Sequence, residues 1–390
     1  MLQLSLTPGI GPVMSRRLVR RFGSIEAMLR ATPADLRQVE GIGDKLAAKF
    51  AAGLRESRGA AEREVELCER AGVRVVAAGE KGYPPLLAES RDAPIVLFVR
   101  GDPGAMTRAY TVALVGSRGC TPYGIEQAER FAGFLASSGL VVVSGGARGV
   151  DSAAHRAALR NRGTTVAVLG CGLSHCYPPE NADLFAQIVE GGGAIVSELP
   201  MDTPPTPENF PARNRVISAL SLGVLVVEAP RGSGALITAR CAVDDHGREV
   251  MAVPGRIDSP ASEGSNELIK KGEAAMVTAP GDVLELLESQ ARHLWQGTHE
   301  SRYASPDEGG LDADGAPVAT LFRGAAAPAS AAVVLTERQT RVVGALASPL
   351  SLEELIRATG LDAGALQADL TILELRRVVR REGGTFARRA

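Results

Sequence analysis

The chain has 390 residues, of which 45% are hydrophobic and 23% charged, and its net charge is −2. This length can bury a full core and favours two or three domains. It contains no apolar run near the ~18 residues of a membrane span, and its first residues lack the positive charge and cleavage pattern of a signal peptide. We therefore expect a soluble, cytoplasmic protein. The five cysteines are scattered without a C-x-x-C pair, which predicts reduced thiols.

The charge is distributed unevenly. Residues 1–59 carry ten Lys or Arg against five Asp or Glu, a net charge of +5. Residues 332–390 carry nine against seven, a net charge of +2, which leaves −9 for the segment between them. Basic flanks on an acidic centre favour an anionic partner for the two ends.

One glycine motif occurs twice near the N-terminus. Gly9-Ile10-Gly11 and Gly41-Ile42-Gly43 lie 32 residues apart, and each precedes a helical pattern. A short helix, this turn and a second helix form a helix-hairpin-helix, whose glycines let backbone amides face a DNA phosphate without reading bases. The alternative is that the two hairpins only pack together as a small helical domain.

The segment from about residue 60 to 290 alternates apolar runs with helical stretches. The runs are continuous, which is typical of strands buried on both faces. They cover residues 110–116, 140–146, 164–170, 193–198, 223–229 and 249–255. This order predicts a doubly wound, mostly parallel α/β sheet, whose ligands bind beyond the carboxyl ends of the strands.

The C-terminal part begins with a stretch of biased composition. Residues 296–331 are rich in Gly, Ala, Pro, Ser and Asp and predict a flexible linker. Three amphipathic helical patterns and a strand-turn-strand follow in residues 332–390, the order of a winged helix. The expected recognition helix, residues 363–375, carries Asp369 and Glu374 and no basic residue, so we do not expect major-groove reading. The arginines after it either contact a nucleic-acid backbone or form a solvated face; they are Arg376, Arg377, Arg380 and Arg381.

A glycine-rich loop, residues 144–149, follows the apolar run 141–143 and precedes a helical pattern. Backbone N–H groups converge at such a turn and can hold a phosphate. The loop matches neither G-x-x-x-x-G-K-[ST] nor G-x-G-x-x-G, and no lysine with a magnesium-binding hydroxyl stands in it. We interpret it as a phosphate cradle without hydrolytic machinery.

Similar features follow other predicted strands. Ser117 and Arg118 come after the run 110–116, and Gly232-Ser233-Gly234 opens a helical pattern. A further helical pattern begins near Phe210 and contains two arginines. Several cradles and arginines along one sheet edge favour a polynucleotide, which offers a phosphate at every nucleotide, over a mononucleotide.

Other reactive residue types are interpreted as structural. Cys171, His175 and Cys176 make a poor tetrahedral metal site, so no metal is predicted. His155 lies among alanines one turn into a helix and is predicted to be buried and hydrogen-bonded rather than a catalytic base. Asp151 is predicted to cap that helix or to interact with its dipole. No serine stands in a G-x-S-x-G elbow beside a placed base, so no nucleophilic catalysis is predicted.

Taken as a series, segments of this chain resemble the DNA-processing protein A family, also called Smf. The segments include "VALVGSRGCTPYG", "VVVSGGARGVDSAAHRAAL", "FPARNRVISALS" and "GSNELIKKG", and together they cover residues 60 to 290. The resemblance implies an extended Rossmann domain over residues 60–295. It also implies a helix-hairpin-helix or SAM-like domain at 1–59 and a winged-helix domain at 332–390, after the linker 296–331.

The same resemblance implies a function. The protein would be no enzyme and need no cofactor; it would bind single-stranded DNA, form a homodimer and protect incoming DNA. It would also help to load RecA recombinase in natural transformation and recombination, with single-strand binding protein as a further partner.

The resemblance also implies where DNA binds. Phe210 would stack on a base, since every base has a π-face. Family members carry a lysine just upstream, in a stretch where this chain has Pro207, and the alternative for Phe210 is a core position beneath the loop. The implied DNA-binding residues are Ser117, Arg118, Ser144, Gly145, Gly146, Ala147, Arg148, Gly149, Phe210, Arg213, Asn214, Arg215, Ser233, Gly234 and Lys271.

An enzyme of another class stays open as an alternative. Nucleoside monophosphate phosphoribohydrolases use a similar glycine loop for one phosphate and an acidic residue at the glycosidic bond. Glu198 and Glu228, at the ends of two predicted strands, are the carboxylates that such an enzyme would need.

Overall fold

A computed structural model describes residues 1–108, 110–295, 336–346, 348–362, 365–367, 369–370, 373, 378–382 and 385–388. Within these ranges, none of the helices combines the length and the hydropathy that a membrane span needs.

A nine-stranded sheet forms the centre of the fold, with the strand order β1-β2-β6-β5-β4-β3-β7-β8-β9. β1 pairs antiparallel with β2, and β2 with β6, whereas the other neighbours run parallel. The strands are β1 (Val73–Ala77), β2 (Val96–Gly101), β3 (Thr111–Val115), β4 (Val141–Ser144), β5 (Thr165–Val168), β6 (Ala194–Ser197), β7 (Gly223–Val226), β8 (Glu249–Ala252) and β9 (Ala275–Met276). The predicted doubly wound, mostly parallel sheet is confirmed.

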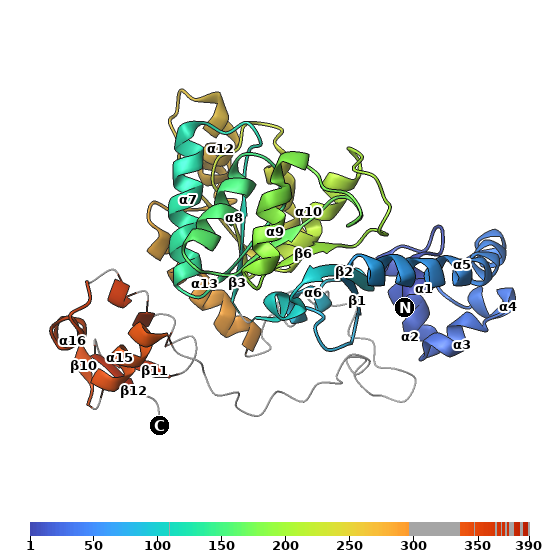
Figure 1. The fold of residues 1–390 in the computed structure, drawn as a ribbon, viewed down its shortest axis with the longest axis horizontal. Helices are drawn as coiled ribbons and strands as arrows, with labels where there is room; N and C mark the ends of the chain where they lie inside the picture. The colour runs from blue at the N-terminus through green and yellow to red at the C-terminus, as the bar shows by residue number, and fades with distance from the viewer. Residues whose placement is uncertain are drawn as a thin grey trace.

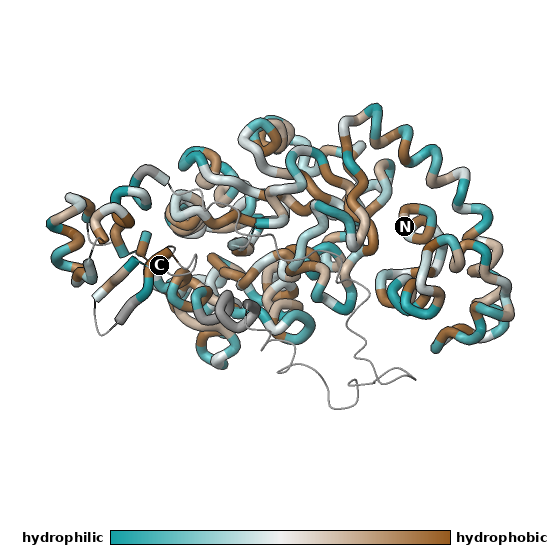
Figure 2. Tube along the Cα trace, turned by 90° about the horizontal axis from the view of Figure 1, so that it is seen from below, coloured by the Kyte–Doolittle hydropathy of each residue, from teal (hydrophilic) through white to brown (hydrophobic). Residues whose placement is uncertain are grey.

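Helices cover both faces of this sheet (Figure 1). One face packs against α7 (Pro122–Ser137), α8 (Val150–Arg160), α9 (Ala182–Glu190) and α13 (Pro280–Trp295). The other packs against α10 (Asn209–Ala219), α11 (Gly234–Asp244) and α12 (Glu263–Lys271), with the short α6 (Pro85–Ala88) beside them. Hydrophobic residues concentrate in the strands between the two layers (Figure 2). Because the apolar runs face helices on both sides, they are continuous.

The connections place a ligand crevice beside β3. From β3 the chain proceeds through β4, β5 and β6 on one side, and then returns to β7, β8 and β9 on the other. The strand order therefore reverses between β3 and β7. In open α/β sheets, ligands bind outside the carboxyl ends of the strands at such a point.

The N-terminal part contains the two predicted hairpins. Its helices are α1 (Leu2–Ser5), α2 (Pro12–Phe22), α3 (Ile25–Leu29), α4 (Pro33–Leu36) and α5 (Asp44–Arg70). Gly9 and Gly41 have φ values of +88° and +84°, which glycine tolerates, and α2 and α5 start directly after Gly11 and Gly43.

Helix α5 continues past the hairpins into the central domain. It runs for 27 residues, so the predicted boundary between residues 59 and 60 falls inside a helix. In its second half, the buried Glu64 carboxylate accepts a hydrogen bond of 2.5 Å from the Met201 N–H. This contact ties α5 to the segment between β6 and α10.

The C-terminal part has a small sheet and a core of its own. Its described elements are α15 (Glu337–Ala345), β10 (Leu350–Ser351), α16 (Leu352–Thr359), β11 (Val379–Glu382) and β12 (Thr385–Arg388), with the strand order β10-β12-β11. Asp369 is buried and paired with Arg338 at 2.5 Å, so this acidic residue belongs to the core. The predicted linker 296–331 and the arginines Arg376 and Arg377 lie outside the described residues.

Candidate nucleic-acid interface

The glycine loop between β4 and α8 packs against the loop that follows β3. Gly149 has a φ of +73°, and a Cβ at this position would lie 2.3 Å from the carbonyl oxygen of Ser117, so that only glycine fits. The Val150 N–H donates to the same oxygen over 3.3 Å. The structure thus brings Ser117 and Arg118 beside the start of α8, although their predicted contact with DNA stays a prediction.

The inner side of the glycine loop is filled by the chain's own charges. The buried Asp151 carboxylate accepts a hydrogen bond from the Ala147 N–H at 3.2 Å. The buried Arg213 donates to the Gly145 carbonyl at 2.6 Å and to the Val168 carbonyl. Burial raises the pKa of Asp151, and the guanidinium of Arg213 opposes that rise. A phosphate can therefore approach only the outer rim of the loop.

Several of the predicted site residues support the loops from inside. The Ser144 hydroxyl is fully buried and donates to the Leu114 carbonyl at 2.6 Å. Asn214 donates to the Gly234 carbonyl at 3.0 Å and joins α10 to the start of α11. Gly146 is also buried, with a φ of +64°. Ser144 thus holds two strand ends together and Asn214 holds two helices together, and both side chains are buried.

Arg118 and Phe210 form the exposed part of the edge. The guanidinium carbon of Arg118 lies 4.9 Å from the centroid of the Phe210 ring. The Tyr177 ring is 5.4 Å from Phe210 at an angle of 46°. Arg118 is exposed, and in the described part of the chain no carboxylate lies within ion-pair distance of it. A free cation over an aromatic ring can contact a phosphate and a base together.

Phe210 has features of both predicted alternatives, an exposed base-stacking ring and a core residue beneath the loop. It is half-buried, and a Cβ on Gly170 would lie 2.9 Å from its ring, so one part of the ring packs closely on the backbone after β5. Arg118 covers another part. A base that reaches this cluster can stack on the guanidinium plane or on the ring edge that Arg118 leaves open.

Three other predicted cations are already paired. Arg148 is exposed and bound to Glu180. Lys271 pairs with Glu267 at 2.9 Å on α12, where it borders a groove of about 410 Å³ together with Arg231 and Arg240. Ser233, a predicted site residue without charge, has a structural role: its hydroxyl caps α11 by accepting a hydrogen bond of 3.3 Å from the Ala235 N–H.

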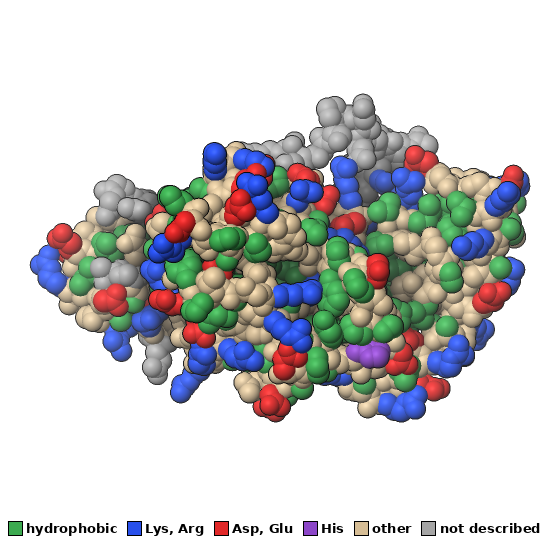
Figure 3. Space-filling view, turned by 90° about the horizontal axis from the view of Figure 1, so that it is seen from above, with side chains coloured by type: hydrophobic (Ala, Val, Ile, Leu, Met, Phe, Trp, Pro, Cys, Tyr) green, Lys and Arg blue, Asp and Glu red, His purple; other side chains and the backbone are tan. Residues whose placement is uncertain are grey.

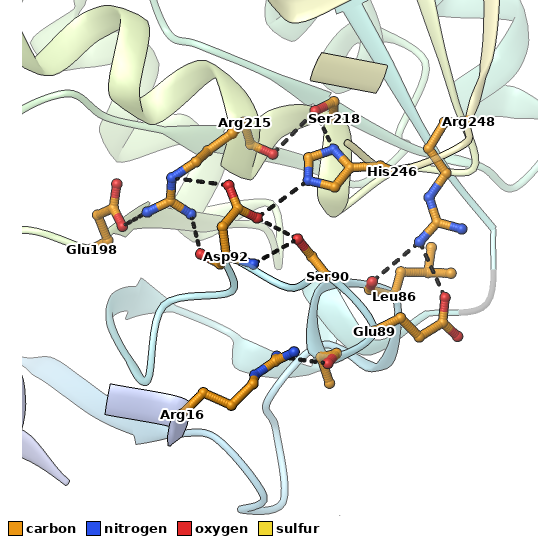
Figure 4. Close-up of polar contacts among 11 residues, drawn as sticks. Arg16, Leu86, Glu89, Ser90, Asp92, Glu198, Arg215, Ser218, His246 and Arg248 are labelled. Atoms are coloured by element: carbon orange, nitrogen blue, oxygen red, sulfur yellow. Dashed lines mark hydrogen bonds and ion pairs between the residues drawn. The ribbon is translucent and has the colours of Figure 1, made fainter. Parts of the chain in front are cut away.

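The third paired cation, Arg215, lies in a polar network on the other side of α10 (Figure 4). It donates to the Asp92 carbonyl at 2.6 Å and to the Glu198 carboxylate. The Asp92 carboxylate also accepts a hydrogen bond from Ser90 and lies 3.4 Å from His246 Nε2. Arg215 therefore anchors α10 to the segment before β2, and its charge is compensated.

The carboxylates of the alternative enzyme are both engaged. Burial raises the pKa of Glu198, and the paired Arg215 opposes that rise. Glu228 is 1% exposed and accepts hydrogen bonds from the N–H and the hydroxyl of Thr121, at 2.7 and 2.8 Å. These bonds fix the turn between β3 and α7.

His155 has the buried, hydrogen-bonded surroundings that the sequence predicts. His155 is fully buried, with Nδ1 2.7 Å from the Thr165 hydroxyl. Among the residues that the structure describes, no group of three or more His, Cys, Asp or Glu side chains is placed to hold a metal ion.

Sequence reasoning missed two residues beside the cluster. Tyr177 packs on Phe210, and Glu180 compensates Arg148. Both belong to the loop between β5 and α9, far in sequence from α10. Their type and spacing carry no signal that would connect them with the glycine loop.

The fold and sequence match known families. The family model described as DNA recombination-mediator protein A matches residues 74–288. A SAM-like helix-hairpin-helix tandem matches residues 2–56, and the DprA winged helix domain matches residues 325–385.

Curated relatives and solved structures agree with these matches. Protein Smf of Escherichia coli is 46% identical over 63% of this chain and 65% of its own length. Protein Smf of Synechocystis is 33% identical over 97% of this chain and 96% of its own length. The X-ray structure of DNA processing protein A (DprA) from Streptococcus pneumoniae is 33% identical, with a TM-score of 0.63 over 73% of this chain and 95% of that chain. The chain therefore belongs to the DNA recombination-mediator protein A family, the family of the Smf and DprA proteins.

Proposed function

We propose that the edge around Arg118 and Phe210 binds single-stranded DNA and that the protein acts on it without catalysis. The observation that carries this proposal is the unpaired, exposed guanidinium held 4.9 Å above an aromatic ring, beside a loop that only glycine can form. Such a pair offers charge to the backbone and a flat surface to an unstacked base. A DNA duplex keeps its bases stacked, so its backbone could contact the Arg118 guanidinium but its bases could not stack on this pair.

The later steps of the proposal rest on family membership. We propose that the protein works in the cytoplasm as a homodimer that protects incoming single strands and loads RecA recombinase onto them, with single-strand binding protein as a further partner. Exposed and paired cations make the outer surface of this edge mixed in charge (Figure 3).

The phosphoribohydrolase alternative has weaker support. Its two carboxylates, Glu198 and Glu228, are bound to Arg215 and Thr121 and would have to leave these partners to act on a substrate. Incubation with AMP, followed by a search for free adenine, tests it directly. Release of adenine at a rate that depends on Glu198 would favour the enzyme.

The central test is charge reversal at Arg118. Arg118→Glu should weaken binding of labelled single strands of every base sequence, because phosphate contacts carry no base information. It should also lower the slope of log affinity against log salt by about 0.7 for each lost phosphate contact. Fluorescence titration of single-stranded and duplex DNA at several salt concentrations measures both effects.

The matched control is Arg156→Glu. Arg156 is exposed on α8, outside the loop, so its reversal changes the net charge equally and should leave most of the affinity. Thermal unfolding confirms that both variants fold. If folded Arg118→Glu protein binds single strands as tightly as the parent with the same salt slope, the proposed interface is wrong.

A further inference from the structure

A second apolar feature lies at the same edge of the sheet, beyond Arg118 and Phe210. Tyr123, in the first turn of α7, is 40% exposed, and Ile257, in the loop after β8, is fully exposed. The start of α7 and the loop that leads into α12 both lie at the upper end of the sheet in Figure 1. Neither residue takes part in the site described above.

Hydrogen bonds hold the Tyr123 ring and the start of the loop that carries Ile257 in place. The Tyr123 hydroxyl donates to the Pro254 carbonyl at 2.7 Å, which ties the ring to the loop of Ile257. Gly255 exchanges two hydrogen bonds with the Asn266 side chain, at 3.0 and 3.1 Å. An apolar surface that is already ordered costs little conformational entropy when it binds a ligand.

This surface continues the line of the proposed DNA site. Phe210 packs on Gly170 after β5, Arg118 follows β3, and Tyr123 bonds to Pro254 after β8. The strands β5, β4, β3, β7 and β8 are consecutive neighbours in the sheet. Four strand spacings of about 4.8 Å place the two ends of this line about 19 Å apart. That distance requires more than one nucleotide of a single strand.

The exposed ring and aliphatic side chain of the second surface favour contact with bases. Arg256, next to Ile257, is paired with Asp258 at 2.8 Å, so the tip of the loop carries no uncompensated charge. Burial raises the pKa of the Tyr123 phenol, Glu228 adds to this rise, and the exposed Arg130 on α7 opposes it. A neutral base can stack on the ring and pack against the aliphatic side chain.

We propose that Tyr123 and Ile257 form a second base-binding platform, which takes bases of the same single strand that Arg118 and Phe210 hold. The inference rests on the proposed function, because it requires a single strand at the first cluster. It assigns a second contact to that strand, one that adds affinity without adding a phosphate contact.

The test uses the full chain and oligothymidylates of increasing length. Removing one stacked base costs about 1–3 kcal/mol, so Tyr123→Leu should weaken binding of long oligonucleotides about 5- to 150-fold. The shortest oligonucleotides that still bind through Arg118 and Phe210 should be unaffected. The salt slope should also be unchanged, since no phosphate contact is lost. 2-Aminopurine placed along the strand should lose its Tyr123-dependent quenching in this variant.

Two further variants separate stacking from loop structure. Tyr123→Phe keeps the ring and loses the bond to Pro254, and it should retain most of the affinity and the quenching. Ile257→Ser should weaken long-strand binding more than Val65→Ser, which removes a β-branched residue that is 41% exposed on α5.

The outcomes distinguish this inference from the proposed function. If the parent binds single strands and Arg118→Glu does not, while Tyr123→Leu binds every length like the parent, only the second platform is wrong. If Tyr123→Phe loses as much affinity for long strands as Tyr123→Leu, the effect comes from the lost hydrogen bond to Pro254 rather than from stacking. That result would also overturn the second platform. If the parent itself binds no single-stranded DNA, the proposed function fails first.

Discussion

Arg118 and Arg213 lie at the same edge of the sheet and carry the same charge, yet their surroundings separate their roles. Arg213 is 4% exposed and bound to two backbone carbonyls beside Asp151, and burial lowers its pKa to about 10. Arg118 is exposed and stacks on Phe210. Breaking the buried pair would leave an uncompensated charge inside the protein, whereas Arg118 can change partners at little cost. Arg213 therefore belongs to the architecture and Arg118 to the proposed interface.

At the same scale, His155 makes the stability of the fold depend on pH. The Thr165 hydroxyl donates its proton to the Val142 carbonyl at 2.6 Å, so the imidazole Nδ1 acts as the donor to Thr165. Burial, followed by the charges of Arg213 and Arg156, lowers the pKa of His155 to about 3. In the unfolded chain a histidine protonates near pH ~6.5.

The sign of the effect follows from proton binding. Between these two pKa values the unfolded state binds more protons, so the free energy of unfolding falls as the pH drops through about 6.5. Between pH 7 and pH 5 we expect His155 to lower the free energy of unfolding by about 2 kcal/mol. Urea denaturation at each pH measures this change. His155→Gln should reduce that dependence. An NMR titration in which the folded protein protonates His155 near neutral pH would contradict the prediction.

At the scale of elements, α10 is fastened from two sides. Arg213 links it to the loop after β4, and Arg215 links it to Asp92, ahead of β2. Phe210 starts the same helix, so these contacts set the position of the ring under Arg118. The polar network around Asp92 therefore supports the interface without touching a ligand (Figure 4).

We predict that Asp92→Asn lowers the free energy of unfolding at pH 7 by about 2 kcal/mol. Arg215 keeps its hydrogen bond to the Asp92 carbonyl but loses the ion pair of 3.5 Å with the carboxylate, and the hydrogen bond from Ser90 loses its charged acceptor. Burial raises the pKa of Asp92, but hydrogen bonds from His246 and Ser90 together with Arg215 hold it well below its usual range. A depressed folded pKa contributes stability above the unfolded pKa of about 3.9 and loses it as the pH falls below that value. The difference in the free energy of unfolding between parent and variant should therefore decrease only below about pH 3.9.

Asp258→Asn is the matched control, since Asp258 is paired with Arg256 on an exposed loop. Surface pairs of this kind contribute about 0–1 kcal/mol. Denaturant unfolding of both variants at pH 7 and at about pH 3, below the unfolded pKa of the carboxyl group, compares the two. Equal stability of parent and Asp92→Asn protein would show that the network does not hold α10.

At the scale of the whole molecule, the C-terminal part has a separate hydrophobic core, built from Val342, Val343, Leu346, Leu355, Leu366, Leu370, Leu373, Val379 and Phe386. The central sheet has its own cores on both faces. Each part can therefore bury its apolar residues without the other.

We accordingly predict that a chain ending at residue 295 keeps its fold and most of its affinity for single strands. Circular dichroism, thermal unfolding and DNA titration against the full chain measure the two properties. Aggregation of the shortened chain would contradict the predicted linker at 296–331. A large loss of affinity in a folded chain would assign DNA binding to the winged helix.

The sequence by itself determined the type of sheet, the positions of β3 to β8, the two hairpins and the family. These features depend on local patterns: continuous apolar runs, glycines at turns and ordered motifs. The same reasoning did not predict β1 and β2. In β1, Val73 and Val76 are buried whereas Arg74 is exposed, so this outer strand lacks the continuous run that marks the central ones. β2 does have a continuous buried run, residues 96–99, so its sequence carried the signal.

Only the tertiary structure decided which arginines can meet a ligand. Arg213 and Arg215 are two positions apart on α10, and residues at this spacing point to different sides of a helix. One meets Gly145, 68 residues away, and the other meets Asp92, 123 residues away, so both are engaged. Arg118 is exposed and stacks on Phe210, and its charge acts on the buried Asp151 without an ion pair in the described part of the chain. Sequence spacing carries no record of such long-range partners, because they are set by how strands and helices pack.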